Sequence, residues 1–225
     1  MKQQLHVAFV TIGQTPRSDI VPEMLSEIEL GFDRDRLVVS EYGVLDGLEG
    51  AALDAMRAGE GEEIFATRLR DGTEIAISVE RTEARLNELL HALDGKVDLI
   101  VMLCTGTRTE PLARTLVIEA QSVVDKTVEA LAASCRRLGV IVPLAGQVGD
   151  FSAHHAFDGE TVVVSASPYS QGDFEAAASQ LADCDLIVMH CMGYDSAMHE
   201  RVKAKAGKPV LLSRRVVAGV ARQLI

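Results

Sequence analysis

The chain has 225 residues and a formal net charge of −11, with 33 Asp and Glu against 22 Lys and Arg. This acidic balance, with no Trp and 4% aromatic residues, argues against nucleic-acid binding, which uses basic patches and aromatic stacking platforms. No apolar run reaches the roughly 18 residues of a membrane span, and the N-terminal apolar run shows no signal-peptide cleavage pattern. We therefore expect a cytoplasmic α/β protein that binds neither nucleic acid nor a membrane.

Short runs rich in Val and Ile alternate along the chain with amphipathic stretches. The expected strands, in chain order, are residues 5–12, 37–41, 74–79, 98–104, 115–119, 138–143, 161–166, 185–191 and 209–213. Several are continuous apolar runs, which is typical of strands buried on both faces of a parallel sheet.

Three apolar stripes at helical spacing lie between these runs. Their members are Leu86, Leu89, Leu90 and Leu93; then Val124, Val128, Leu131, Cys135 and Leu138; then Phe174, Ala177, Ala178 and Leu181. Strands that alternate with helices in this way predict an α/β fold with parallel sheets.

A ten-residue segment occurs twice. Residues 98–107 read DLIVMLCTGT and residues 185–194 read DLIVMHCMGY, so both copies run from an Asp through Leu-Ile-Val-Met to a Cys-x-Gly turn. Two shorter echoes, VTIGQ at 10–14 against PLAGQ at 143–147 and VVS at 38–40 against 163–165, occur in the same order. We infer a duplication into two pseudo-symmetric parallel-sheet domains, residues 1–110 with 209–225 and residues 111–208.

The duplicated cysteines, Cys104 and Cys191, are the candidate catalytic residues. Ligands of open α/β sheets bind beyond the carboxyl ends of the strands, where both thiols are expected. The turns that follow them offer backbone N–H groups that can hold an anion and stabilise a thiolate. Their residues are Thr105, Gly106 and Thr107 after the first thiol and Met192, Gly193 and Tyr194 after the second.

A packed core residue is the alternative for any single cysteine at a strand end. Duplication of the whole Cys-x-Gly turn favours a reactive pair instead. Cys135 and Cys184 lack this context and are expected to be structural. Without a Cys-x-x-Cys pair or other convergent ligand spacing, we expect no disulfide framework and no metal.

The segment after the first expected strand contains Gly13, Gln14 and Arg17. Glycine permits a close backbone approach, and an arginine can pair with a substrate carboxylate. An ordinary strand–helix turn with a surface arginine is equally compatible. The segment matches no nucleotide-binding fingerprint. His190 alternates to the opposite side of its strand from Cys191 and is expected in the core, whereas Tyr194 could cover a bound substrate.

These residues resemble a known group of enzymes. Paired cysteines at equivalent strand ends of two similar α/β halves resemble the aspartate/glutamate racemase superfamily, and within it the chain is most similar to the AroM family. The matching segments are Thr11-Ile12-Gly13 with Pro16, then 139–143, 191–194 and 209–213. The resemblance implies an active site in the interdomain cleft, with Cys104 and Cys191 as acid and base on a small carboxylate-bearing molecule. It implies no cofactor, and it places Gly13 and Gln14 along the cleft.

Two departures from glutamate racemases affect the expected reaction. Those enzymes carry Asp-Ser-Gly after the first strand and Thr-His after the second cysteine, where this chain has Thr11-Ile12-Gly13 and Met192-Gly193. Isomerisation or decarboxylation of a dicarboxylate and racemisation of a hydantoin therefore stay open beside amino-acid racemisation. A non-catalytic ligand-binding or regulatory protein is the alternative from another class. A homodimer is the default assembly.

Overall fold

The computed structural model describes residues 4–30, 36–154 and 159–225. The chain divides into two compact units, unit 1 with Met1–Gln121 and Val217–Ile225, and unit 2 with Ser122–Val216. The boundaries fall inside two helices, α4 (Ala120–Ala132) and α8 (Ser213–Leu224). The domain limits expected from the sequence, 110/111 and 208/209, stay a prediction.

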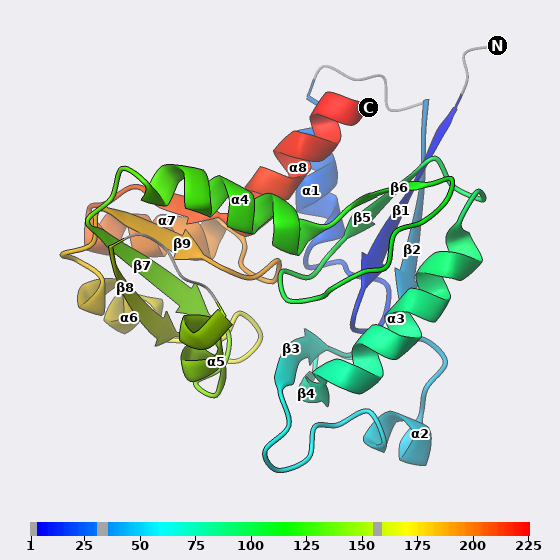
Figure 1. Cartoon of the computed structure of the whole chain (residues 1–225), viewed down its shortest axis with the longest axis horizontal. Helices are drawn as coiled ribbons and strands as arrows, with labels where there is room; N and C mark the ends of the chain where they lie inside the picture. Colours follow the sequence, from blue (N-terminus) through cyan, green and yellow to red (C-terminus); the bar gives the residue numbers. More distant parts are fainter. Residues whose placement is uncertain (1–3, 31–35, 155–158) are drawn as a thin grey trace. The chain divides into compact units, whose positions relative to one another are not determined.

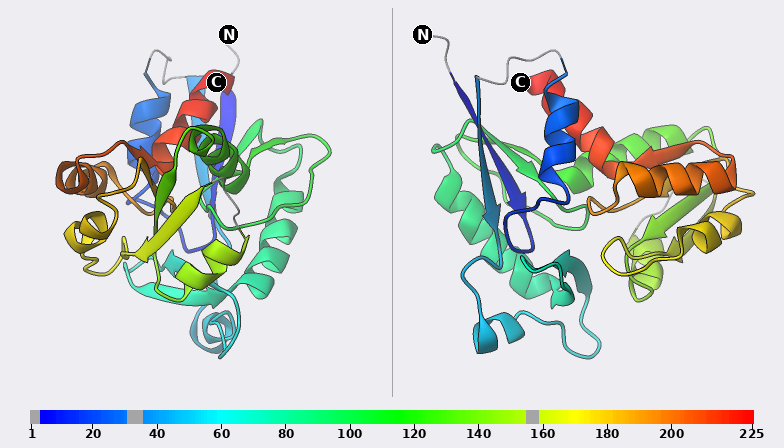
Figure 2. Two further views of the ribbon diagram at one scale, coloured as in Figure 1. Left: turned by 60° about the vertical axis from the view of Figure 1, so that its left-hand side comes forward. Right: turned by 180° about the vertical axis from the view of Figure 1, so that it is seen from behind.

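Unit 1 is built on a sheet of four parallel strands, in the order β2-β1-β5-β6. Their bounds are Leu37–Gly43 (β2), Leu5–Thr11 (β1), Leu99–Met102 (β5) and Leu116–Ile118 (β6). Figures 1 and 2 show α3 (Val79–Leu93) on one face, and α1 (Val21–Ile28) with the unit 1 part of α8 on the other.

Unit 2 is built on a second parallel sheet, in the order β10-β9-β7-β8. Its strands are Val210–Leu212 (β10), Leu186–Met189 (β9), Arg137–Val142 (β7) and Glu160–Ser165 (β8). One face packs against α6 (Phe174–Gln180) and α7 (Ser196–Ala206), and α5 (Gln147–His154) lies on the opposite face (Figures 1 and 2). The predicted α/β fold with parallel sheets is confirmed.

The two sheets repeat one design. Strands β2-β1-β5-β6 correspond in order to β8-β7-β9-β10. The register agrees as well, because Leu99 pairs with Val7 while Leu186, its counterpart in the repeat, pairs with Leu138. The same correspondence makes the first residues of α4 and α8 equivalent. These matches support a duplicated α/β unit.

The two shorter sequence echoes do not belong to this duplication. The sheet register makes Val10 equivalent to Ile141, so VTIGQ is two residues out of step with PLAGQ at 143–147. It makes Val39 equivalent to Thr161, so VVS at 38–40 is three residues out of step with 163–165. Both expectations were wrong because short β-branched runs recur in any set of strands.

Unit 1 carries an addition between β2 and α3. It contains the short helix α2 (Gly50–Asp54) and an antiparallel hairpin of β3 (Ile64–Arg68) and β4 (Glu74–Ser78). Residues 74–79 were expected in a parallel sheet, but β4 pairs with β3 instead, and β3 was not predicted. Figure 1 shows the hairpin beyond the carboxyl ends of β1 and β2.

The expected helical stripes are confirmed for α3 and α6, whose inward residues Leu86, Leu90, Phe174 and Ala178 are buried. The stripe assigned to α4 is wrong at its C-terminal end. Leu131 is 44% exposed there, and Cys135 and Leu138 lie beyond the helix, the latter within β7.

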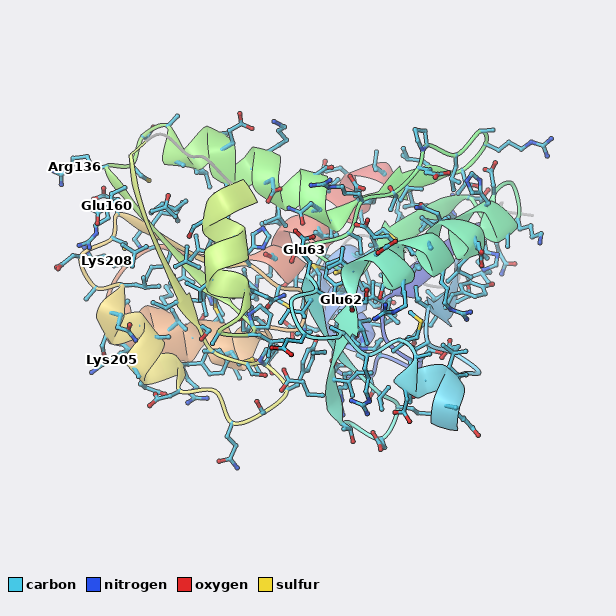
Figure 3. All side chains as sticks on the ribbon, turned by 60° about the horizontal axis from the view of Figure 1, so that its bottom comes forward. Glu62, Glu63, Arg136, Glu160, Lys205 and Lys208 are labelled. Atoms are coloured by element: carbon cyan, nitrogen blue, oxygen red, sulfur yellow. The ribbon has the colours of Figure 1, made fainter. Side chains whose placement is uncertain are left out.

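Charged side chains gather at the amino ends of the unit 2 strands. Figure 3 shows Arg136, Glu160 and Lys208 at this end, and Arg137 forms an ion pair with Glu160 at 3.2 Å. The opposite, carboxyl end is the one at which Cys191 lies. Within the described residues, no helix is both long and apolar enough to cross a membrane.

Candidate active site

The two repeated cysteines occupy the same place in the two units. Cys104 follows β5 and Cys191 follows β9, each two residues beyond the last residue of a central strand. Both thiols are half-buried and outside any disulfide. The structure therefore places each thiol at the carboxyl end of its sheet, as expected from the sequence.

The turn after Cys191 is held by hydrogen bonds to its backbone groups and to the sulfur. The backbone N–H of Gly193 donates a hydrogen bond to Cys191 Sγ at 3.3 Å. Arg214, which is 1% exposed, holds this turn from the start of α8. Its Nε and Nη2 donate to the Met192 carbonyl oxygen at 3.1 and 2.9 Å, and Nη2 also donates to the Gly193 oxygen at 3.2 Å.

The side chains of Met192 and Tyr194 are buried. The Tyr194 hydroxyl donates a hydrogen bond to the Ala166 carbonyl oxygen at 2.8 Å. Its ring packs edge-on against the Phe174 ring, with the two ring centroids 5.9 Å apart. A Cβ on Gly193 would lie 2.5 Å from the Tyr169 hydroxyl, so a larger residue here would require the Tyr169 side chain to shift. The buried side chains of Met192 and Tyr194 support the turn from the protein core. A contact between Met192, Gly193 or Tyr194 and a substrate stays a prediction.

His190 lies in the core of unit 2, as expected. It is 6% exposed, its Nε2 lies 2.9 Å from Asp125 Oδ1, and its ring meets Phe151 of α5 edge-on at 4.9 Å. Cys191 packs instead against the cluster under α6 and α7. The histidine and the thiol therefore face opposite sides of the sheet.

The turn after Cys104 is held by carboxylates. Glu119 accepts hydrogen bonds from the backbone N–H and the hydroxyl of Thr109, both at 2.9 Å. Glu83 of α3 accepts the N–H of Arg108 at 2.9 Å. These two N–H groups are therefore engaged by the protein's own acidic side chains.

Within the turn itself, Thr105 and Thr107 are buried and Gly106 is exposed. A Cβ on Gly106 would lie 2.7 Å from the Phe65 ring of β3, so the hairpin packs directly on this turn. In the part of the chain that the structure describes, Thr107 Oγ1 is buried without a hydrogen-bond partner. Such a group is suited to a polar ligand or a water molecule.

Gly13 and Gln14 connect β1 to its surroundings. A Cβ on Gly13 would overlap the backbone of Arg68, so the hairpin requires glycine here. The Gln14 amide donates to the carbonyl oxygens of Leu45 and Leu48, both at 3.3 Å, and accepts the N–H of Arg70 at 3.0 Å. Both residues join three loops of unit 1, and a role in substrate binding stays a prediction.

Arg17 is buried in an ion pair. Its Nε and Nη2 donate to the two oxygens of Asp19 at 2.9 and 2.8 Å, and Nη1 donates to Thr11 Oγ1 at 2.7 Å. Burial raises the pKa of Asp19, but the hydrogen bonds and charge of Arg17 outweigh it and the pKa is lowered overall. In this structure the guanidinium therefore organises the loop after β1, and its contact with a substrate carboxylate stays a prediction.

Sequence reasoning missed Arg214 and Thr67. Arg214 stands in a Ser-Arg-Arg run that looks like a solvated helix start. Thr67 lies in the unpredicted strand β3, and its buried Oγ1, like that of Thr107, has no partner among the described contacts. The equivalence of Arg214 with the residue after Ala120 could be found only from the sheet register.

Two other features were considered as a binding site for a substrate or for a metal ion, and neither contains the expected groups. A groove of about 380 Å³ lies beside the carboxyl end of β2, and neither thiol lines it; its lining is Tyr42, Gly43, Val44, Asp46, Arg85, Glu88 and Leu89. The described residues contain no group of three or more His, Cys, Asp and Glu side chains placed to hold a metal ion.

The family follows from a match over nearly the whole sequence. Residues 7–225 match the family model described as AroM protein. The chain belongs to the AroM family. A comparison of this AroM-family chain with curated proteins finds no match.

Solved structures with the same fold include two enzymes. Maleate isomerase Iso from Pseudomonas putida S16 has a TM-score of 0.51 and 15% identity, over 97% of this chain and 91% of that one. Glutamate racemase from Francisella tularensis subsp. tularensis SCHU S4, in complex with D-glutamate, has a TM-score of 0.51 and 11% identity, over 100% of this chain and 81% of that one. At this identity the likeness shows that the AroM-family chain shares their fold.

Proposed function

We propose that this AroM-family protein is a racemase or isomerase of the aspartate/glutamate racemase superfamily. It uses Cys104 and Cys191 as acid and base on a small carboxylate-bearing substrate and needs no cofactor. The observation that carries the proposal is the placement of one half-buried thiol at the carboxyl end of a central strand in each half of a duplicated fold. A packing role alone would not require the same thiol and glycine in both copies.

The proposed reaction starts with one cysteine as a thiolate and the other as a protonated thiol. A thiolate removes a proton from the carbon next to the carboxylate, and the second thiol delivers a proton to the same carbon from its other side. The carboxylate holds the electron pair between the two transfers. The proposal requires that both sulfur atoms reach one substrate carbon.

The surroundings of the thiols favour a substrate whose C–H bond is already acidic. Thr11 hydrogen-bonds Arg17 where a glutamate racemase has an acidic residue, and the buried Met192 follows Cys191 directly. With less assistance to the thiols, a dicarboxylate whose C–H bond lies between its two carboxyl groups, or a hydantoin, is a better substrate than an unactivated amino acid. The maleate isomerase that shares the fold keeps dicarboxylates in the panel of candidate substrates.

The test is hydrogen exchange at the substrate carbon. The reduced protein is incubated in D₂O with a panel of amino acids, dicarboxylates and hydantoins, and loss of the C–H signal is followed by NMR. We expect exchange with at least one compound, and a fall of at least about 100-fold in Cys104→Ser and in Cys191→Ser. Cys135→Ser is the matched control and should keep the rate.

Two results would contradict the proposal. One is full exchange in both Cys104→Ser and Cys191→Ser. The other is an absence of exchange across a panel in which some compounds nevertheless raise the melting temperature. The second result would favour the non-catalytic ligand-binding protein.

A further inference from the structure

The duplication allows the surroundings of the two thiols to be compared position by position. The pairing of β10 with β9 and of β6 with β5 makes Val210 equivalent to Val117. Counting on from this pair, Arg214 is equivalent to Gln121. The residue that holds the Cys191 turn is therefore a cation in unit 2 and a neutral amide at the matching place in unit 1.

The side chains that hold the Cys191 turn and the loop after the Cys104 turn carry opposite charges. Around Cys191, the guanidinium of Arg214 donates to both carbonyl groups that follow the thiol, and the Gly193 N–H donates to the sulfur. Around Cys104, the carboxylates of Glu83 and Glu119 accept the N–H groups of the following loop. A nearby cation favours a thiolate and nearby carboxylates favour a thiol.

Three acidic residues of unit 2 are each engaged by a partner other than Cys191. Asp195 is the acid nearest to Cys191 in the chain, and it caps α7 by accepting the Met198 N–H at 2.8 Å. Glu175 of α6 is paired with Arg201 of α7 at 2.6 Å. Asp125 pairs with His190 on the other face of the sheet.

In unit 1, three further charged or titratable groups lie on α3 and on the loop that follows Cys104. Arg108 is exposed, so water screens its charge. Glu110 and His91 of α3 form an exposed pair at 3.0 Å. Arg17, a buried cation beside the end of β1, donates to Thr11 Oγ1 at 2.7 Å and is paired with Asp19 at 2.8 Å. The carboxylates of Glu119 and Glu83 accept hydrogen bonds from the loop that follows Cys104.

We infer that Cys191 is the resting thiolate and Cys104 the resting thiol, and that Arg214 is the positioning residue that makes them differ. This assignment rests on the proposed function. The Cys191 thiolate takes the proton from the substrate carbon and becomes a thiol, and the Cys104 thiol gives its proton to that carbon and becomes a thiolate. One proton leaves the carbon and one arrives, no atom is oxidised, and exchange with water restores the resting state.

The test needs no substrate. The rate of alkylation of each cysteine by iodoacetamide is measured from pH 5 to pH 10 by peptide mass spectrometry, in the reduced full-length protein. We compare the midpoints of the profiles and not the absolute rates, because the accessibility of a thiol changes its alkylation rate but does not change the pH of the midpoint. Cys135 serves as a reference, since its thiol is half-buried and burial raises its pKa.

We expect the Cys191 midpoint to lie below that of Cys104. In Arg214→Gln, which copies the unit 1 residue, the Cys191 midpoint should rise by about one pH unit, a tenfold loss of thiolate at neutral pH, while the Cys104 midpoint stays. Arg214→Lys should restore most of the shift. Arg215→Gln removes the same charge from the exposed neighbour and should leave both midpoints in place.

Two outcomes overturn the inference. One is a Cys104 midpoint at or below that of Cys191 in the natural protein, a comparison that no misfolded variant can obscure. The other is an unchanged Cys191 midpoint in a folded Arg214→Gln protein. If substrate hydrogen exchanges but the Cys104 midpoint lies below that of Cys191, this inference is wrong and the proposed function stands. If the midpoints have the expected order but no substrate hydrogen exchanges, only the proposed function is wrong.

Discussion

Asp98 and Asp185 open the two copies of the repeat and fasten the neighbouring strand in the same way. Asp98 accepts the backbone N–H of His6 at 2.8 Å, and Asp185 accepts the N–H groups of Arg136 and Arg137 at 2.8 and 3.1 Å. His6 and Arg137 are equivalent in the two sheets. The duplicated aspartate is thus explained by the register of the central strands.

Asp185→Asn should therefore lower stability at neutral pH. The backbone N–H groups of Arg136 and Arg137 lower the pKa of Asp185 from its usual value of 3.8. A lowered pKa contributes stability above the usual value, and this contribution is lost as the pH falls below it. The melting temperatures of the variant and the natural protein should differ at pH 7 and converge below about pH 4.

Asp183→Asn is the matched control, because Asp183 stands two residues earlier and its side chain is 90% exposed. It should change the melting temperature little at either pH. A gap between Asp185→Asn and the natural protein that persists unchanged at pH 3 would contradict the assigned role of the carboxylate.

Single-residue reasoning from the sequence found both thiols and both glycine turns, since the repeat displays them in order. It could not find Arg214, whose partners are the carbonyl groups of Met192 and Gly193 about twenty residues away in the chain. Backbone acceptors leave no trace in a sequence pattern. The burial of Arg17 in an ion pair could not be predicted for a similar reason, because its partner Asp19 also looks like a surface residue in the sequence.

At the scale of elements, periodicity predicted the strands that are apolar on both faces and the helices with a continuous apolar stripe. No continuous apolar stripe marks α7, in which His199 and Val202 are the buried residues and Met198 packs beside them. Periodicity missed β3 because IFATR is short and mixed in polarity. Such elements are held by the surface on which they pack and not by their own pattern.

The hairpin of β3 and β4 is expected to depend on Gly13. In Gly13→Ala the new Cβ would meet Thr67 Oγ1 at 2.5 Å and the backbone of Arg68, so the hairpin must move off the end of β1. Overpacking of this kind costs about 1–3 kcal/mol. Urea unfolding should show this loss, and hydrogen exchange should rise at the backbone amides of 64–68.

Gly219→Ala is the control for this substitution. Its Cβ would enter open space on the exposed side of α8, so the helix should gain up to about 1 kcal/mol. Equal stability changes in the two variants would show that the close contact at Gly13 does not constrain the hairpin.

At the scale of the whole molecule, one α/β plan is used twice and modified differently in each half. Unit 1 inserts the β3–β4 hairpin between β2 and α3, whereas unit 2 inserts α7 between β9 and β10. The shared plan repeats the position of the thiol, and the differences change what surrounds it. The proposed acid and base roles require the two thiols to differ in charge, and these differences are where that contrast is expected to arise.

The most direct test of this account is whether the two thiols can be joined to each other. The reduced protein is treated with diamide at neutral pH and mapped by mass spectrometry, since a disulfide requires Cα atoms within about 7 Å. We predict an intramolecular Cys104–Cys191 disulfide that Cys135→Ser leaves unchanged. If neither diamide nor a dithiol-reactive crosslinker spanning about 7 Å, twice the reach from a thiol to a reacting carbon, joins the two cysteines in the folded protein, the two sulfur atoms do not serve one substrate carbon and the two-cysteine mechanism is wrong.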